Sequence, residues 1–201
     1  MKNHISFALV LIAISFVLLL FIPITCVNSE KTTTNISNTL TIAETWLADG
    51  VIGDQEYSNN AQYFGYYIYW LSDDQYVYIG IRAQTQGYVS IGFQPGSGMK
   101  DADIVLGFVE GVNVTVIDSF STGDVGPHPE DTQLGGTNNI IEYGGSENDG
   151  FTTIEFKRAL NTGDEYDIPL IMGLNKIMWS FGSNDGSKVR HTARGYGEII
   201  L

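Results

Sequence analysis

The stretch GYVSIGFQPGSGMKDADIVLGFV, residues 87–109, decides the fold of this chain. In residues 88–94 large apolar side chains alternate with small ones, the period-2 pattern of a strand with one buried face. Residues 104–109 are apolar on both sides of the pleat, which predicts a central strand. The Gly-rich loop 95–103 joins the two strands and carries Met99, where a surface loop normally has polar residues. Because ligands often bind where loops leave a rigid β-fold, we expect this loop to lie at one mouth of the fold, beside a binding site.

Further short strands are expected on both sides of this stretch. The runs 65–71 and 76–83 flank the turn sequence Ser-Asp-Asp-Gln, which predicts a hairpin. More strands are predicted at residues 112–120, 151–158, 176–181 and at the C-terminal end, 199–201. With 23 glycines, 11 tyrosines and only 16% charged residues, the chain has the composition of an all-β domain. We therefore predict an immunoglobulin-like sandwich of two antiparallel β-sheets.

The N-terminus is a separate segment. Residues 5–27 are almost wholly apolar and follow the positive charge of Lys2. This run reaches the length of about 20 residues that a bilayer-spanning helix needs. We expect a signal peptide or membrane anchor helix at 1–29, a linker at 30–40 and the β domain at 41–201, with a buried structural helix as the alternative for the apolar run. The domain would then lie outside the cytoplasmic membrane, secreted or anchored to the membrane through the N-terminus.

Composition excludes several function classes. The formal net charge of −13 and the pI of about 4.3 argue against nucleic acid as a partner, because the chain would repel phosphate. The single cysteine, Cys26, lies in the apolar segment, so the domain has neither a disulfide nor a thiolate metal site. The sequence motifs GxSxG and HExxH and the P-loop are absent, and the acidic residues show no catalytic pairing. We do not expect an enzyme.

Six segments in a fixed order carry a resemblance to a known family. They are residues 87–109, VIDSF at 116–120, GFTTIEFKR at 150–158, LNTGD at 160–164, MWSF at 178–181 and HTARG at 191–195. Together they resemble a DOMON domain, the family named after the N-terminal part of dopamine β-monooxygenase. The family also includes the cytochrome part of cellobiose dehydrogenase and b-type cytochrome proteins of membranes. The resemblance covers roughly residues 41–201 and implies a β-sandwich.

The resemblance also implies a cofactor. In haem-binding DOMON domains, a methionine in the first loop and a histidine near the C-terminal end are the axial ligands of haem b, and Met99 and His191 match these positions. Met/His ligation raises the reduction potential and suits electron transfer to a redox partner protein. Arg190 and Arg194 flank the histidine and are candidate partners for the haem propionates. Because a CxxCH motif is absent, such a haem would be held without thioether bonds.

Two other interpretations stay open. Met99 could fill a gap at the sandwich mouth and His191 could be a hydrogen-bonding loop residue. The domain would then be a cofactor-free binding or adhesion module for a carbohydrate or a protein. Its aromatic residues would be either a stacking surface for sugars or ordinary β core, namely Tyr63, Tyr66, Tyr67, Tyr69, Trp70, Tyr76 and Tyr78. A weaker alternative is a monooxygenase-type domain without its copper partner, since three histidines are too few for the copper sites.

Two polar groups complete the candidate residues. Asp101 and Asp103, with Asp118, offer oxygen ligands for Ca²⁺, although solvation of turns and strand ends is the favoured role. His128 lies between prolines in the long connection 121–138. It is a candidate metal ligand or proton carrier, but we expect an exposed, solvated side chain. The connection itself is longer than ordinary loops, which predicts a functional or mobile segment.

Overall fold

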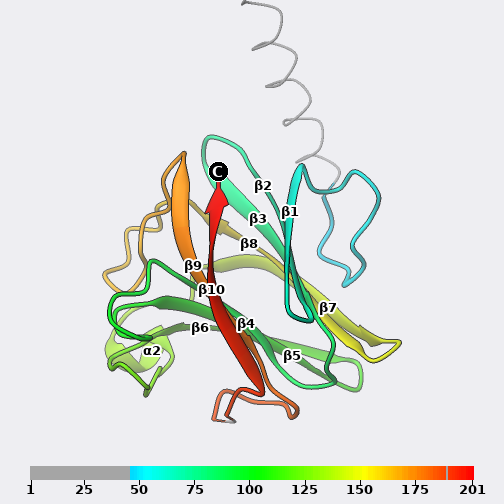
Figure 1. Ribbon diagram of the computed structural model, residues 1–201. Coiled ribbons are helices and arrows are strands. Elements are labelled where there is room, and N and C mark those ends of the chain that lie inside the picture. The colour runs from blue at the N-terminus through cyan, green and yellow to red at the C-terminus, as the bar shows by residue number, and fades with distance from the viewer. Residues whose placement is uncertain (1–45, 189) are drawn as a thin grey trace, which may run out of the picture.

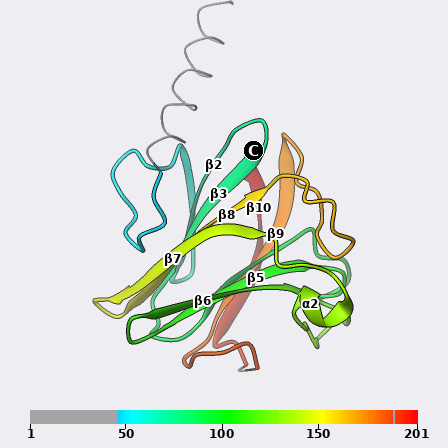
Figure 2. The same ribbon diagram turned by 180° about the vertical axis from the view of Figure 1, so that it is seen from behind.

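The computed structural model describes residues 46–188 and 190–201. The predicted signal or anchor segment, the linker and the start of the predicted domain lie outside the described residues. In the described ranges two antiparallel five-stranded sheets pack face to face, as Figure 1 and Figure 2 show from opposite sides. These ranges contain no helix that is both long enough and apolar enough to cross a membrane. The all-β sandwich is thus confirmed, while its immunoglobulin-like subtype stays a prediction.

Each sheet combines hairpins with strands from distant parts of the chain. Sheet A has the order β1 (Asn59–Tyr63), β2 (Tyr66–Ser72), β3 (Tyr76–Ala83), β8 (Phe151–Ala159) and β7 (Ile140–Asn148). Sheet B has the order β10 (Ala193–Ile200), β9 (Leu174–Phe181), β4 (Val89–Phe93), β5 (Asp103–Glu110) and β6 (Asn113–Phe120). A short helix, α2 (Asp131–Leu134), follows β6.

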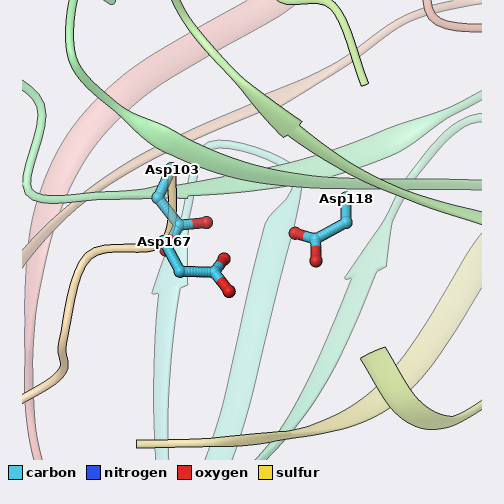
Figure 3. A group of neighbouring side chains, drawn as sticks. All are labelled: Asp103, Asp118 and Asp167. Atoms are coloured by element: carbon cyan, nitrogen blue, oxygen red, sulfur yellow. The ribbon is translucent and has the colours of Figure 1, made fainter. Parts of the chain in front are cut away.

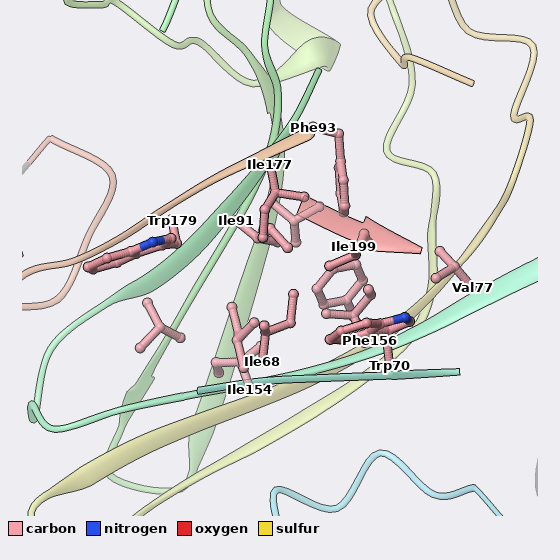
Figure 4. Close-up of a cluster of buried hydrophobic side chains, with 14 of the residues drawn as sticks. Ile68, Trp70, Val77, Ile91, Phe93, Ile154, Phe156, Ile177, Trp179 and Ile199 are labelled. Atoms are coloured by element: carbon pink, nitrogen blue, oxygen red, sulfur yellow. The ribbon is translucent and has the colours of Figure 1, made fainter. Parts of the chain in front are cut away.

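The core lies between the sheets and is built by side-chain alternation. Ile79 and Ile81 of β3 and Ile154 of β8 point inward from sheet A and are fully buried. Ile91 of β4 and Ile177 of β9 meet them from sheet B (Figure 4). Because burial of each such side chain contributes about 1.5–3 kcal/mol, this layer fixes which face of every strand points inward. The outer face of each sheet is therefore available to contact the loops and to form binding sites.

An N-terminal strap, residues 46–57, crosses the outer face of sheet A. Its Trp46 packs edge-on against Tyr78 with ring centroids 5.1 Å apart, and the Trp46 indole donates to the Tyr57 hydroxyl at 2.8 Å. The Tyr57 hydroxyl in turn donates to Glu155 Oε1 at 2.7 Å, while the Gly50 N–H donates to Glu155 Oε2 at 2.7 Å. Burial raises the pKa of Glu155 to about 7. One carboxylate on β8 therefore fastens the strap to sheet A.

The sequence predicted most strands but missed two. The predicted hairpin of β2 and β3 and the predicted pairing of β5 with β6 are confirmed. Edge strand β1 is short and polar, so it lacks an apolar alternation. Edge strand β7 contains Gly144 and Gly145, which weaken a strand pattern. Position 144 requires glycine for a steric reason, because the carbonyl of Ala48 in the strap lies where the Cβ of any other residue would stand.

Candidate functional site

The outer face of sheet B forms the floor of a cavity. Because neighbouring side chains on a strand point to opposite faces, the residues between the core positions of β4, β5 and β9 face outward. Ile104 and Leu106 lie on this face and are nearly fully covered, although they are not part of the core between the sheets. The other floor residues are Ser90, Met178 and Ser180. This floor is apolar at its centre and mildly polar at its sides.

Loops build walls around this floor and enclose about 770 Å³. One wall is the segment from Val125 to Glu130, in the long connection after β6. Another comes from the connection between β9 and β10, with Lys188, Arg190 and His191. The volume falls within the range of about 300–1,000 Å³ that is usual for small-molecule and cofactor sites. The long connection thus has a definite place, as a wall of the cavity.

Met99 lines this cavity from the Gly-rich loop. The loop is tied to the neighbouring wall, since the Met99 N–H donates to the Asp124 carbonyl at 3.0 Å. Gly98 has φ of +61°, and the Asp124 carbonyl leaves no room for a side chain there. From the other side the Tyr196 hydroxyl donates to the Gly98 carbonyl at 3.3 Å. These contacts fix the backbone that carries the half-buried thioether.

His191 lines the same cavity and is half-buried. Burial, followed by the positive charge of Arg194 and then of Arg190, lowers the pKa of His191. The imidazole is therefore neutral at pH 7, the form that binds metals. Both arginines are exposed and border the cavity. The structure thus brings together four residues singled out from the sequence: Met99, Arg190, His191 and Arg194.

Two parts of the sequence-based picture of this site are wrong. The cavity does not lie at a mouth of the sandwich; it lies on the outer face of sheet B, so Met99 does not plug the space between the sheets. His128 is not an exposed loop residue, because it is half-buried and lines the cavity. Burial lowers the pKa of His128. The prolines on both sides of His128 do not indicate, from the sequence, that this segment folds back over a sheet.

Met178 is a cavity residue that the sequence analysis missed. It lies on β9 between the inward-facing Ile177 and Trp179, so its outward direction was readable from the alternation. Its side chain lies flat across Gly92, whose missing Cβ would stand 2.6 Å from Met178 Cε. The cavity therefore contains two thioethers and two imidazoles. Met178 is packed against the floor, whereas Met99 comes from a wall.

The space at the end of the sandwich near Phe93 is filled by a cluster of charged residues. Asp103 and Asp118 lie there together with Asp167, all three buried, and Figure 3 shows the carboxylates of Asp118 and Asp167 facing each other. The buried Arg158 guanidinium donates to Asp103 Oδ2 at 2.6 Å. Asp101, the other residue of the expected Ca²⁺ site, is exposed on a turn and is not part of this cluster.

Stability should fall as the pH rises through the titration of these acids. Burial raises the pKa of Asp118 to about 7. Burial and the Asp118 charge raise that of Asp131 to about 8. Both values lie above the ordinary value near 3.8, so the folded state holds these protons more tightly and loses that advantage as they dissociate. In EDTA we expect the melting temperature to fall by ~5 °C between pH 6.5 and pH 9.

The control for this pH effect is Asp118→Asn, which removes one of the titrating groups and should flatten the decline. The lowered pKa values of His128 and His191 act only below this window. Glu155 has a pKa raised to about 7, so its titration also lowers the stability as the pH rises, as the titration of Asp118 and Asp131 does. A melting temperature that rises from pH 6.5 to pH 9 would contradict the assignment of the buried protons.

The aromatic residues of β2 and β3 do not form one surface. Tyr66 and Trp70 point into the core, as the β-core interpretation expects. Tyr67 and Tyr69 are half-buried on the opposite side of β2. Tyr69 borders a second, smaller cleft of about 480 Å³ under the N-terminal strap. Polar residues dominate this cleft, among them Asp54, Asn60, Arg82, Asn148 and Asp149.

Comparisons with known proteins give one family and several partial relatives. The family model described as "DOMON domain" matches residues 62–182. "MOXD1 homolog 1" of Drosophila melanogaster is 30% identical over 125 residues, which cover 59% of this chain and 18% of that protein. "DBH-like monooxygenase protein 1" of Mus musculus is 29% identical over 140 residues, which cover 68% of this chain and 22% of that protein. The chain therefore spans about a fifth of the length of these relatives.

Two cytochrome domains are among the solved structures to which this chain shows limited similarity. The cytochrome b domain of pyranose dehydrogenase from Coprinopsis cinerea has a TM-score of 0.47 at 14% identity and covers 67% of this chain and 74% of that chain. The cytochrome domain of cellobiose dehydrogenase from Myriococcum thermophilum has a TM-score of 0.47 at 10% identity, with 68% of this chain and 74% of that chain covered.

Proposed function

Because this chain belongs to the DOMON domain family and carries Met99 and His191 on one cavity, we propose that it binds haem b through these two residues and transfers electrons. The observation that carries the proposal is the shared cavity. The two residues lie far apart in the sequence, yet they border the same space of about 770 Å³. A thioether and a neutral imidazole are the ligand pair of electron-transfer haem sites with a raised reduction potential.

The donor set and the surroundings fit this group. Ile104 and Leu106 offer an apolar floor for a porphyrin face, and burial of apolar surface contributes about 25 cal/mol per Å². Arg190 and Arg194 at the exposed border offer positive charge for the propionates. When bound, haem would supply reversible one-electron chemistry.

The residues of this chain would have binding and tuning roles rather than catalytic ones. His191 would keep its nitrogen lone pair free because its pKa is lowered. The wall from Val125 to Glu130 would exclude water from the floor. With Met99 and His191 both holding the haem, the site would carry electrons and would not activate oxygen. We further propose that the domain works outside the cytoplasmic membrane, exported or anchored through residues 1–29, with a protein as redox partner.

One absorption spectrum tests the proposal. Purified protein supplied with haem should show a Soret band and, after reduction, the sharp α-band of six-coordinate low-spin iron. The titration should saturate at one haem per chain. Protein that folds cooperatively but shows no saturable Soret band would overturn haem binding.

Carbohydrate binding is the second candidate, and the cleft under the N-terminal strap is the observation that favours it. Tyr69 offers an aromatic face, while Asn60 and Arg82 offer planar polar groups beside it. Such a combination binds sugars by stacking and by hydrogen bonds. Binding to a glycan array by protein without a Soret band, abolished by Tyr69→Ala, would favour this function over electron transfer.

A further inference from the structure

The cluster of charged residues near Phe93 joins the two sheets at one end of the sandwich. Asp103 on β5 and Asp118 on β6 share the inward-facing side of sheet B with the core residues Val105 and Val116. Arg158 shares the inward-facing side of sheet A with Phe156 and is 1% exposed. Asp167 comes from the connection between β8 and β9. Polar groups at such core positions need partners, because burial of an uncompensated charge is costly.

The partners available within the described part of the chain do not satisfy these carboxylates. Asp103 Oδ2 accepts from the Arg158 guanidinium and from the Ile168 N–H at 3.0 Å. Asp118 Oδ2 accepts from the Asn139 N–H at 2.7 Å. One oxygen each of Asp103, Asp118 and Asp167 is buried without a hydrogen-bond partner. Arg158 Nη2 lies 3.5 Å from Asp167 Oδ1, too far for a strong hydrogen bond.

A fourth buried carboxylate points independently to a cation at this end of the sandwich. Asp131, the first residue of α2, is 0% exposed, and both of its oxygens lack a partner among the described residues. A backbone bridge between Ser119 and Glu130 places it beside the end of β6. Besides burial, the negative charges of Asp118, Asp167 and Asp103 raise the pKa of Asp131. Four buried carboxylates therefore share this end of the sandwich with one guanidinium, and if all four were ionised an uncompensated charge of −3 would remain.

We propose that Asp103, Asp118, Asp131 and Asp167 bind one Ca²⁺ ion, which connects the two sheets and α2. One oxygen each of Asp103, Asp118 and Asp167 lies within 4.8 Å of the other two. That spacing suits a cation with Ca–O distances of about 2.3–2.6 Å. Carboxylates without sulfur or imidazole select hard cations, and a site of irregular shape favours Ca²⁺ over the strictly octahedral Mg²⁺. The positive charge would replace protons that burial otherwise forces onto these acids.

This site is separate from the cavity but shares a segment with it. Asp131 directly follows Glu130, which lines the cavity wall. A bound ion would therefore hold α2 and the adjoining end of that wall against β6. The proposal does not depend on haem, because none of the four carboxylates lines the cavity.

The test uses the full chain stripped with EDTA and returned to metal-free buffer at pH 7.5. Calorimetric titration with CaCl₂ should show one site. One millimolar Ca²⁺ should raise the melting temperature by ~5 °C or more, as expected when a ligand at about 100 times its Kd binds only the folded state. Mg²⁺ at the same concentration should give a much smaller shift.

Asp118→Asn should lose at least ~90% of the Ca²⁺-induced shift, because it removes a ligand and a charge. Asp167→Asn serves the same purpose if the first variant does not fold. Asp101→Asn is the matched control: Asp101 is exposed, two residues from Asp103, and its φ of +61° suits asparagine, so its Ca²⁺ response should equal that of the wild type.

Three outcomes would overturn the proposal. The wild type could show neither heat nor a melting shift with up to 5 mM Ca²⁺, which would mean that the acids hold protons instead. Mg²⁺ could bind in place of Ca²⁺. The asparagine variants could keep the full Ca²⁺ response, which would place the ion elsewhere.

Discussion

Replacing His191 with alanine should weaken haem binding at least ~100-fold, because loss of even an outer partner of a metal ligand costs 10–100-fold in affinity. Replacing Met99 with leucine should leave the haem bound but convert the iron to a high-spin form. The reduced α-band should disappear, and the reduction potential should fall, since thioether ligation raises it. Absorption spectra and potentiometric titration of each variant measure both effects.

The cavity supplies its own matched controls. Met178→Leu changes the second thioether of the cavity, and His128→Ala removes the second imidazole. Both should keep the wild-type spectrum and stoichiometry. If Met178→Leu abolishes the α-band while Met99→Leu retains it, the thioether ligand has been assigned to the wrong methionine. The same comparison between His128 and His191 tests the imidazole.

Replacing Arg158 with methionine should destabilise the metal-free protein by about 3–5 kcal/mol at pH 7.5. The substitution preserves most of the apolar volume but leaves the buried carboxylates of Asp103 and Asp167 without their counter-charge. The loss should be smaller at pH 5, because burial raises the pKa of Asp103, and a protonated Asp103 no longer needs the guanidinium as its counter-charge. Urea denaturation at the two pH values measures the difference.

Lys157 is the neighbouring control for this experiment. Its ammonium group lies 3.7 Å from Glu142 on the outer side of sheet A and is partly exposed. Because exposed ion pairs contribute little, Lys157→Met should cost less than ~1 kcal/mol. Equal losses for the two variants would show that Arg158 contributes as an ordinary surface charge rather than as the centre of a buried network.

The fold was largely predictable because its signal is local. Alternation in β3, β4 and β8 and the two-sided apolar run in β5 follow directly from which face of each strand is buried. The edge strands β1 and β7 were not predicted, because each is stabilised by only one neighbouring strand. In β7, Gly144 also makes close contact with the strap. Long-range contact of this kind has no signature in a short stretch of sequence.

The candidate site was predictable only in part. Family resemblance pointed to Met99 and His191, whereas Met178 was available from the alternation of β9 and was overlooked. Arg158 was also available, since it stands at a core position of β8 and requires a buried acid. By contrast, Asp131 and Asp167 come from connections whose paths are set by tertiary packing. The position of His128 in the cavity could not be predicted for the same reason.

The position of the N-terminal strap has a consequence for orientation. The described chain enters the domain at Trp46, packed on the outer face of sheet A, while the cavity opens on the outer face of sheet B. Sheets A and B pack face to face, so the strap and the cavity lie on opposite outer faces of the sandwich. A domain tethered at its amino-terminal side would therefore present the cavity outward, where a docking protein could approach it without meeting the tether.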